Sequence, residues 1–318
     1  MGSNILILGA GGQIGTELAE KLRMKYGNTS VITSDIHKKE IYQNDPYFEI
    51  IDAKDFSAVK SAIKKHKIDT VYLLAAMLSA TGEKYPEKAW DLNMTSLFNV
   101  LNLAKEGLIN QIFWPSSIAV FGPTTPKVNT PQHTTCEPTT VYGITKQVGE
   151  RWCEYYHKKY GVDVRSIRYP GIISHKTQPG GGTTDYAVDI FHEALKNKTY
   201  TCFLSKNTRL PMMFMDDAIE GTLQLMATDA QKLTVWSSYN LGAMDFTPAE
   251  LATCIKNHIP DFEISYHPDY RQAIADSWPS SINDVTARQD WGWSPSFHLE
   301  KTVALMIEKL YLKIMVNG

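Results

Sequence analysis

The 318-residue chain lacks the features that mark several large classes of protein. Its four cysteines, Cys136, Cys153, Cys202 and Cys254, form no C-x-x-C pair, which argues against a structural zinc site and favours a reducing compartment. The nine histidines make no H-E-x-x-H motif. There is no apolar run of about 18 residues to span a bilayer. A formal net charge of −2 at pH 7 gives no electrostatic footprint for nucleic acid. We therefore expect no metal, membrane or nucleic-acid partner.

What the chain does have is enough apolar sequence for a large core. Hydrophobic residues make up 43% of the chain and charged residues 21%, over a length that suits about two domains. No signal peptide precedes the first apolar run, which starts at residue 4. We expect a soluble cytoplasmic protein, or one of the mitochondrial matrix if a transit peptide has been removed, that acts on small molecules.

The N-terminal residues predict the first strand, turn and helix of a dinucleotide site. An apolar run over residues 4–8 leads into GAGGQIG over residues 9–15 and then into an amphipathic helical stretch. Glycine permits the sharp turn and the close approach to a pyrophosphate, and a helix N-terminus presents unpaired N–H groups to its charge. The G-x-x-G-x-x-G spacing differs from the commoner G-x-G-x-x-G form. The expected cofactor contacts are Gly9, Gly12, Gln13, Ile14 and Gly15.

Two acids follow the next apolar runs. Asp35 ends the run over residues 31–35, where a carboxylate binds the adenosine ribose hydroxyls and repels a 2′-phosphate, so the sequence predicts NAD rather than NADP. The basic residues at 37–39 could instead attract that phosphate. Asp52 and Ala53 end the third run and could meet the adenine, although Asp52 is also explained as a capping or loop carboxylate.

Residues 70–76 predict a fourth buried strand, followed by a loop with Ser79. Small residues at the end of a strand let a flat ring lie against the backbone. Ser79 is a candidate contact to the substrate or ribose, or an ordinary loop serine. Asn93 is polar among apolar neighbours in the next helix. A buried amide needs partners, so Asn93 either fixes a helix kink or orders a water in a proton path from Lys146.

Ser117, Tyr142 and Lys146 are the predicted catalytic residues. At four residues' separation on a helix, Tyr142 and Lys146 lie on one face, so the ammonium is expected beside the phenol. A nearby cation would bring the phenol pKa down from about 10 towards neutrality. Ser117 would hold the reacting oxygen. Thr139 is expected to cap this helix after Pro138.

A second Tyr-x-x-x-Lys occurs at Tyr155 and Lys159. Tyr155 lies thirteen residues beyond Tyr142, which rotates it by roughly 140° around the helix. It is therefore expected to be a surface or interface residue.

The alternation of strands and helices up to residue 169, with a sixth strand over 163–169, predicts an α/β fold with a doubly wound parallel Rossmann sheet. We expect an NAD-binding domain over residues 1–171 and a smaller mixed α/β substrate lobe over 172–318, with segments near 210–245 returning to the first domain. Helices are expected near 186–197, 216–227, 247–258 and 298–313, a short strand near 238–241, and a capping box from Thr247 to Glu250.

With these residues in view, the chain resembles the extended short-chain dehydrogenase/reductase superfamily over its full length. Within it, the chain is similar to the epimerase-like NAD-dependent L-threonine 3-dehydrogenases. The strings that carry the resemblance cover residues 75–80, 115–122, 168–173, 179–187, 210–218 and 276–279. The resemblance implies threonine catabolism, with oxidation of the threonine β-hydroxyl to 2-amino-3-oxobutanoate and transfer of a hydride to NAD. It implies a homodimer built through helices that include 87–105 and 140–160.

The resemblance also assigns residues around the cofactor and the substrate. Leu74, Ala75 and Ala76 would flank the cofactor, and Tyr169, Gly171 and Ile172 would line the nicotinamide. A small zwitterionic substrate needs donors for its carboxylate, which the N–H groups and hydroxyls of Gly182, Thr183 and Thr184 can supply. Asp185 pairs with the ammonium or, by preference, caps the next helix. Trp278 is a lid aromatic or a hydrophobic plug under a loop.

Other functions are weighed against this one. A nucleotide-sugar epimerase, dehydratase or reductase would need basic residues for a diphosphate, and Arg209, Arg271 and Arg288 are the arginines available for it in the second lobe. A non-catalytic redox sensor would tend to lose Tyr142 or Lys146, and both are present. A zinc-dependent threonine dehydrogenase is disfavoured because the ligand spacing is missing.

Overall fold

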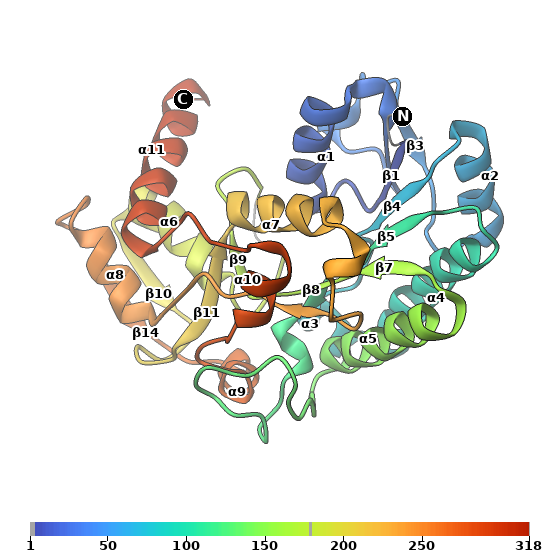
Figure 1. Ribbon diagram of the computed structural model, residues 1–318. Helices are drawn as coiled ribbons and strands as arrows, with labels where there is room; N and C mark the ends of the chain where they lie inside the picture. The colour runs from blue at the N-terminus through green and yellow to red at the C-terminus, as the bar shows by residue number, and fades with distance from the viewer. Residues whose placement is uncertain (1–3, 178–179, 318) are drawn as a thin grey trace.

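A six-stranded parallel sheet forms the centre of the protein, whose computed structural model describes residues 4–177 and 180–317 (Figure 1). In spatial order its strands are β3 (Phe48–Ile50), β2 (Val31–Asp35), β1 (Ile5–Leu8), β4 (Thr70–Leu73), β5 (Gln111–Phe113) and β7 (Asp163–Arg165). All neighbouring pairs run parallel. The order reverses between β1 and β4, as in a doubly wound dinucleotide-binding sheet, so the predicted fold class is confirmed.

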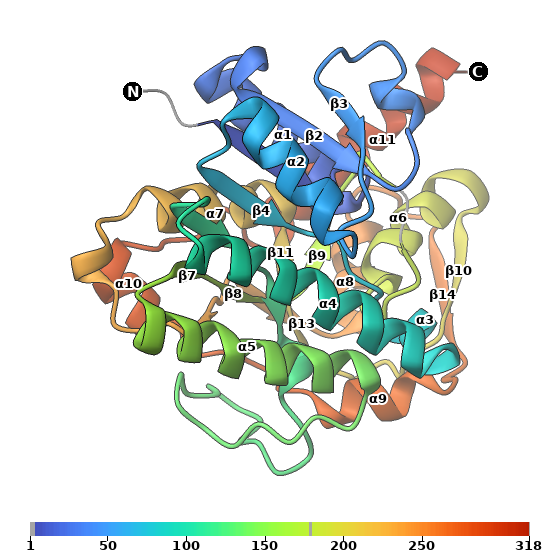
Figure 2. The ribbon, with the colours of Figure 1, turned by 90° about the vertical axis from the view of Figure 1, so that its right-hand side faces the viewer.

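Helices cover both faces of this sheet, because alternate residues of each strand point to opposite sides. Ile5 and Ile7 pack with α1 (Gln13–Tyr26) and α7 (Met215–Ala227). Leu6 and Leu8 pack with α2 (Phe56–His66), α4 (Pro86–Lys105) and α5 (Val141–Tyr160). Figure 2 shows these last three helices side by side over one face. The apolar runs of the sequence are thus buried on both faces.

The predicted single strand over residues 163–169 is wrong, because the structure divides it at Ser166. β7 pairs with β5, whereas β8 (Ile167–Tyr169) lies between β6 (Ser116–Ser117) and β12 (Tyr239–Asn240). β5, which pairs with β7, and β6, which pairs with β8, are likewise separated in the chain, and Pro115 lies between them. Proline has no N–H to donate to a ladder, so the hydrogen bonding stops there and resumes with a new set of neighbours.

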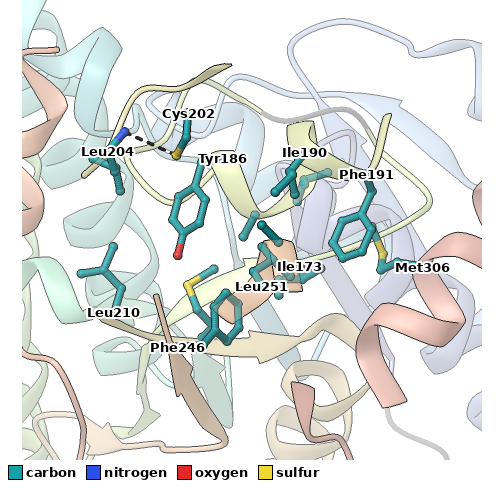
Figure 3. Close-up of a cluster of buried hydrophobic side chains, with 14 of the residues drawn as sticks. Ile173, Tyr186, Ile190, Phe191, Cys202, Leu204, Leu210, Phe246, Leu251 and Met306 are labelled. Carbon is teal, nitrogen blue, oxygen red and sulfur yellow. Dashed lines mark hydrogen bonds between the residues drawn. The ribbon is translucent and has the colours of Figure 1, made fainter. Parts of the chain in front are cut away.

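A second lobe is built on short strands of mixed direction. β11 (Leu210–Phe214) pairs in parallel with β9 (Gly171–Ile173) and antiparallel with β13 (Met244–Phe246). β10 (Thr199–Cys202) pairs with β14 (Glu263–Tyr266). The core between them and the helices is apolar, and Figure 3 shows Tyr186, Phe191, Phe246 and Met306 within it.

The helices expected after residue 172 are confirmed within a few residues at each end. They are α6 (Tyr186–Asn197), α7, α8 (Pro248–Lys256) and α11 (Leu299–Asn317), and the structure adds the short helices α9 (Arg271–Ser277) and α10 (Val285–Trp291). After β4 the expected loop with Ser79 is wrong, because Ser79 begins the short helix α3 (Ser79–Lys84), which packs on α4 and α5. The capping box is present, because the Thr247 hydroxyl accepts from the Glu250 N–H at 3.2 Å and the Glu250 carboxylate accepts from the Thr247 N–H at 2.8 Å.

Segments of residues 210–245 contact both parts of the molecule. β11 pairs with β9, whereas α7 packs beside α1 and β12 pairs with β8. The division of the chain at residue 171 stays a prediction. Over residues 4–177 and 180–317, no helix combines the length and the apolar character that crossing a membrane requires.

Candidate active site

A cleft of about 250 Å³ lies at the carboxyl ends of β1, β4 and β6 and is closed on the other side by the second lobe. The structure brings most of the predicted site residues to its walls. These are Gly9, Gly12, Gln13, Ile14, Gly15, Leu74, Ala76, Ser79, Ser117, Tyr142, Lys146, Tyr169, Gly171, Ile172, Gly182, Thr183, Thr184 and Trp278. Among the predicted residues, Asp35, Asp52, Ala53, Ala75 and Asn93 do not line it.

Sequence reasoning missed several residues of the same walls. Leu78, Pro115, Ser116 and Ile118 line the cleft, and each lies within two residues of a predicted residue. Their position in the chain was the signal that could have found them. Pro179, part of one string that carries the resemblance, lies outside the described residues.

The glycine turn has the geometry that a dinucleotide requires. Gly9 has φ +90°, and a Cβ there would meet the Ala75 nitrogen at 2.5 Å. A Cβ on Gly15 would meet the Gly9 carbonyl oxygen at 2.5 Å, so glycine is needed where β1, β4 and α1 converge. α1 begins after Gly12 without a side-chain cap, which leaves its N-terminus open to the cleft. These residues fit a bound pyrophosphate.

Asp35 is held beside this turn rather than inside the cleft. Its carboxylate accepts from the Gly11 N–H at 2.9 Å and from the Ile36 N–H at 2.8 Å. The carboxylate is therefore bonded directly to the glycine turn, in the place that suits a ribose diol. Asp52 accepts from the Lys54 N–H at 2.9 Å, which agrees with the loop alternative, and its contact to adenine stays a prediction.

Asn93 has a role that neither alternative from the sequence describes. Its side-chain oxygen accepts from the Met77 N–H at 2.8 Å, and its amide donates to the Met77 carbonyl at 3.2 Å and to the Thr145 hydroxyl at 3.0 Å. The Thr145 hydroxyl in turn donates to the Tyr142 carbonyl at 2.8 Å. Asn93 thus fastens the loop after β4 to the first turn of α5, which carries Tyr142.

Tyr142 and Lys146 lie one turn apart on α5, and Ser117 at the end of β6 completes the group. Thr140 caps α5 by accepting from the Gly143 N–H at 3.1 Å, so the prediction of Thr139 is wrong by one residue. The ammonium of Lys146 donates to the Pro115 carbonyl at 2.6 Å and lies 5.5 Å from the centre of the Tyr142 ring.

The charges of this pair differ from the expectation. Loss of water around the phenol raises the pKa of Tyr142 to about 12, against a smaller lowering by a hydrogen bond with Ser117. Burial lowers the pKa of Lys146 to about 7, while Cys153 and Glu150 raise it. The expected lowering of the Tyr142 pKa is therefore wrong for the protein alone, because desolvation outweighs the lowering by the Ser117 hydrogen bond.

The glycine segment of the second lobe is already bonded within the protein. The N–H groups of Gly181 and Gly182 both donate to one oxygen of Asp185, at 2.7 and 2.6 Å. Asp185 makes no side-chain cap to α6, so the preferred capping role is wrong and the expected nest is occupied. Thr183 is a buried residue of the cleft wall, and its hydroxyl has no hydrogen-bond partner within the protein.

Trp278 agrees with the plug alternative, and its role as a lid aromatic stays a prediction. Its side chain is only 7% exposed and packs in the core of the second lobe, and it also forms part of the cleft wall. It directly follows α9 and donates its backbone N–H to the Ala275 carbonyl at 3.1 Å.

A buried ion pair lies beside the group of Ser117, Tyr142 and Lys146. Arg168 donates to both oxygens of Glu150, at 2.8 and 2.7 Å, and the Ser116 hydroxyl donates to the same carboxylate at 2.7 Å. Arg168 also donates to the Gln132 carbonyl and to the Asn240 side chain, both at 3.0 Å. The pair thus joins α5, β6, β8 and β12.

The chain is similar to known proteins over most of its length. The model of the NAD dependent epimerase/dehydratase family matches residues 5–242. An uncharacterized epimerase/dehydratase of Staphylococcus saprophyticus is 48% identical over 310 residues, which cover 96% of each chain. The GalE-like L-threonine dehydrogenase from Cupriavidus necator, in its holo form, is 56% identical with a TM-score of 0.94 and covers 96% of this chain and 99% of its own. A monomeric L-threonine 3-dehydrogenase from a metagenome is 51% identical with a TM-score of 0.93, covering 97% and 99%.

The first prediction concerns the ion pair. Glu150→Leu should lower the free energy of unfolding by about 3–5 kcal/mol, because it leaves the Arg168 guanidinium buried without a counter-charge. The double variant Glu150→Leu/Arg168→Met should recover most of that loss. Urea unfolding measures both. Glu154→Gln, which removes the charge that pairs with Arg151 and Lys158 at the protein surface, should cost less than about 1 kcal/mol and is the control. An equal loss in Glu150→Leu and in the control would contradict the prediction.

The second prediction concerns Asp35. Asp35→Asn keeps an acceptor for the Gly11 N–H but removes the charge that repels a 2′-phosphate. We expect the ratio of kcat/KM for NAD over NADP to fall about tenfold or more, equivalent to ~1.4 kcal/mol. Steady-state rates with each coenzyme provide the measurement. Glu40→Gln changes the net charge equally at an exposed site and should leave the ratio unchanged.

Proposed function

The chain belongs to the NAD dependent epimerase/dehydratase family, and we propose that it is an NAD-dependent L-threonine 3-dehydrogenase. It would oxidise the β-hydroxyl of L-threonine to give 2-amino-3-oxobutanoate and NADH. The observation that carries the proposal is the group of Ser117, Tyr142 and Lys146 facing the glycine turn across one small cleft. The similar structures described as L-threonine dehydrogenases support the choice of substrate.

We assign the candidate residues in and around the cleft to three tasks. Ser117, Tyr142 and Lys146 are catalytic. The residues assigned to NAD are Gly9, Gly12, Gln13, Ile14, Gly15, Asp35, Asp52, Ala53, Leu74, Ala75, Ala76, Asn93, Tyr142, Lys146, Tyr169, Gly171 and Ile172. The residues assigned to threonine are Ser79, Ser117, Tyr142, Gly182, Thr183, Thr184 and Trp278. The residues assigned to NAD lie in residues 1–171 except for Ile172. Of the residues assigned to threonine, Gly182, Thr183, Thr184 and Trp278 lie in 172–318. This distribution supports the proposed division into a cofactor domain and a substrate lobe.

In the proposed reaction, the Tyr142 oxygen as phenolate accepts the proton of the substrate β-hydroxyl. The hydroxyl of Ser117 holds that oxygen in place. NAD, when bound, would supply the acceptor for the hydride that leaves the carbon bearing this hydroxyl. Lys146 keeps its ammonium near the phenol, anchored by the Pro115 carbonyl. The pKa of Tyr142 is about 12, so the phenolate fraction of the protein alone grows as the pH rises towards that value. Lys146, with a pKa of about 7, loses its proton first, so turnover should increase with pH up to about 7 and then level off.

A nucleotide-sugar enzyme of the same family is the alternative. The arginines that could bind its diphosphate are engaged elsewhere, because Arg209 pairs with Asp245 and Glu250, Arg271 with Asp269, and Arg288 with Asp284. None of the three lines the cleft. An assay of NADH formation from L-threonine, beside turnover of UDP- and GDP-sugars, separates the two functions.

Tyr142→Phe tests the base. It removes the group that takes the proton, so kcat should fall about 10²- to 10⁴-fold while the dissociation constant for NAD stays close to that of the wild type. Stopped assays of NADH formation and fluorescence titration with NAD give the two quantities. Tyr155→Phe, in the other Tyr-x-x-x-Lys, is the matched control and should keep wild-type activity. Near-normal turnover in Tyr142→Phe would mean that another group is the base.

We further propose a homodimer and a cytoplasmic or mitochondrial-matrix location. The four cysteines are free, which suits a reducing compartment. Large apolar side chains are exposed along α4 and α5, namely Trp90, Ile144, Trp152 and Tyr155. An exposed apolar patch of this kind is typical of an interface between protein chains.

Light scattering after gel filtration tests the dimer. The wild type should elute at twice the chain mass, and Trp152→Glu should elute at the chain mass, because a charge in the centre of the interface is costly. Tyr311→Glu places the same charge on the exposed end of α11 and should leave the mass unchanged. A wild type at the chain mass would show that the protein resembles its monomeric relative in assembly.

A further inference from the structure

The loop between η3 (Ile118–Val120) and α5 connects the catalytic region with the wall of the substrate pocket. It leaves the site just after Ser117 and runs to α9, beside which Figures 1 and 2 both show it. Its residue Thr130 bridges to Ile282, and the Thr130 N–H donates to the Ser281 carbonyl at 3.0 Å. The loop and the segment after α9 therefore form one hydrogen-bonded unit.

Lys127 is the centre of this unit. Its ammonium donates to the Asp276 carbonyl at 2.6 Å and to the Trp278 carbonyl at 3.1 Å. Its own carbonyl accepts from the N–H and the hydroxyl of Ser280, at 2.8 and 2.9 Å. Lys127 thus bonds to the backbone on both sides of Trp278. The ammonium also sits at the C-terminus of α9, where unpaired carbonyls favour a cation.

The other end of α9 is attached to the second lobe. Gln272 accepts from the Ser205 N–H at 2.7 Å and donates to the Thr208 hydroxyl at 2.9 Å. Without Lys127, α9 would keep this attachment at its start, while the backbone around Trp278 would lose two donated hydrogen bonds. The position of the indole in the cleft wall therefore depends on a lysine that does not itself line the cleft.

We propose that Lys127 is a positioning residue that sets the place of Trp278 and thereby the size limit of the amino-acid pocket. The proposal rests on the proposed function for its choice of substrates. Lys127 acts on the discrimination between L-threonine and its homologue with one more methylene, 2-amino-3-hydroxypentanoate. A wall that fits one methyl group well rejects an added methylene by roughly 10- to 200-fold, and a loosened wall rejects it less.

The test compares Lys127→Met with Lys127→Arg, which keeps a donor, and with Lys301→Met as the control. Lys301 likewise donates to a backbone carbonyl, that of Ser296 at 2.9 Å, but far along the chain from the cleft residues. In Lys127→Met we expect the KM for L-threonine to rise about tenfold with a smaller change in kcat, because Trp278 supplies binding common to ground and transition states. The preference over the longer homologue should fall about fivefold. In Lys127→Arg the KM for L-threonine and the preference over the longer homologue should both stay close to wild type, and Lys301→Met should match the wild type.

Hydrogen exchange of the peptide that covers residues 271–282 gives a readout that needs no substrate. We expect faster exchange in Lys127→Met and wild-type exchange in Lys301→Met, with NAD binding unchanged in both. Unchanged exchange, or an unchanged substrate preference beside faster exchange, would overturn the proposal. If the wild type forms no NADH from L-threonine, the proposed function fails instead, and the exchange data still decide whether Lys127 holds Trp278.

Discussion

The buried pair of Arg168 and Glu150 is the constraint on which the arrangement of the site depends. Both side chains are almost fully enclosed, at 4% and 2% exposure, so neither charge can be left without the other. Three members of the network stand close to a residue of the cleft. Ser116 precedes Ser117, Arg168 precedes Tyr169, and Glu150 lies one helical turn after Lys146. One ion pair thus fixes the relative places of three strands and the helix from which the catalytic group projects.

The interruption at Pro115 has an equally direct effect on the chemistry. Because proline cannot donate to a ladder, the sheet changes its neighbours at this level, and the strand ends open into a cleft. The carbonyl of Pro115 accepts the Lys146 ammonium at 2.6 Å. The same residue that breaks the strand therefore anchors the amine. Asn93 hydrogen-bonds both to Met77 and to Thr145, which fixes the position of the helical turn that carries Tyr142 relative to the loop after β4.

Local pattern was enough to predict the sheet, the glycine turn and most residues of the cleft, because these follow from periodicity and from neighbours in sequence. It failed where the path of the backbone in three dimensions decides, whether the partners are near or distant in sequence. Thr139 and Thr140 are equally good caps, and only the position of Gly143 selects Thr140. The carboxylate of Asp185 binds the glycine N–H groups through a loop conformation that no spacing reveals. The pairing of Arg168 with Glu150 and with Asn240 spans 18 and 72 residues and left no local signal.

The pKa shifts of Tyr142 and Lys146 follow from one cause and lead to one conclusion. Burial disfavours charge on both groups, so it raises the pKa of the phenol to about 12 and lowers that of the amine to about 7. Cys153 and Glu150 raise the Lys146 pKa, but by less than burial lowers it. At neutral pH the protein alone therefore holds Tyr142 as a neutral phenol and Lys146 close to half protonated.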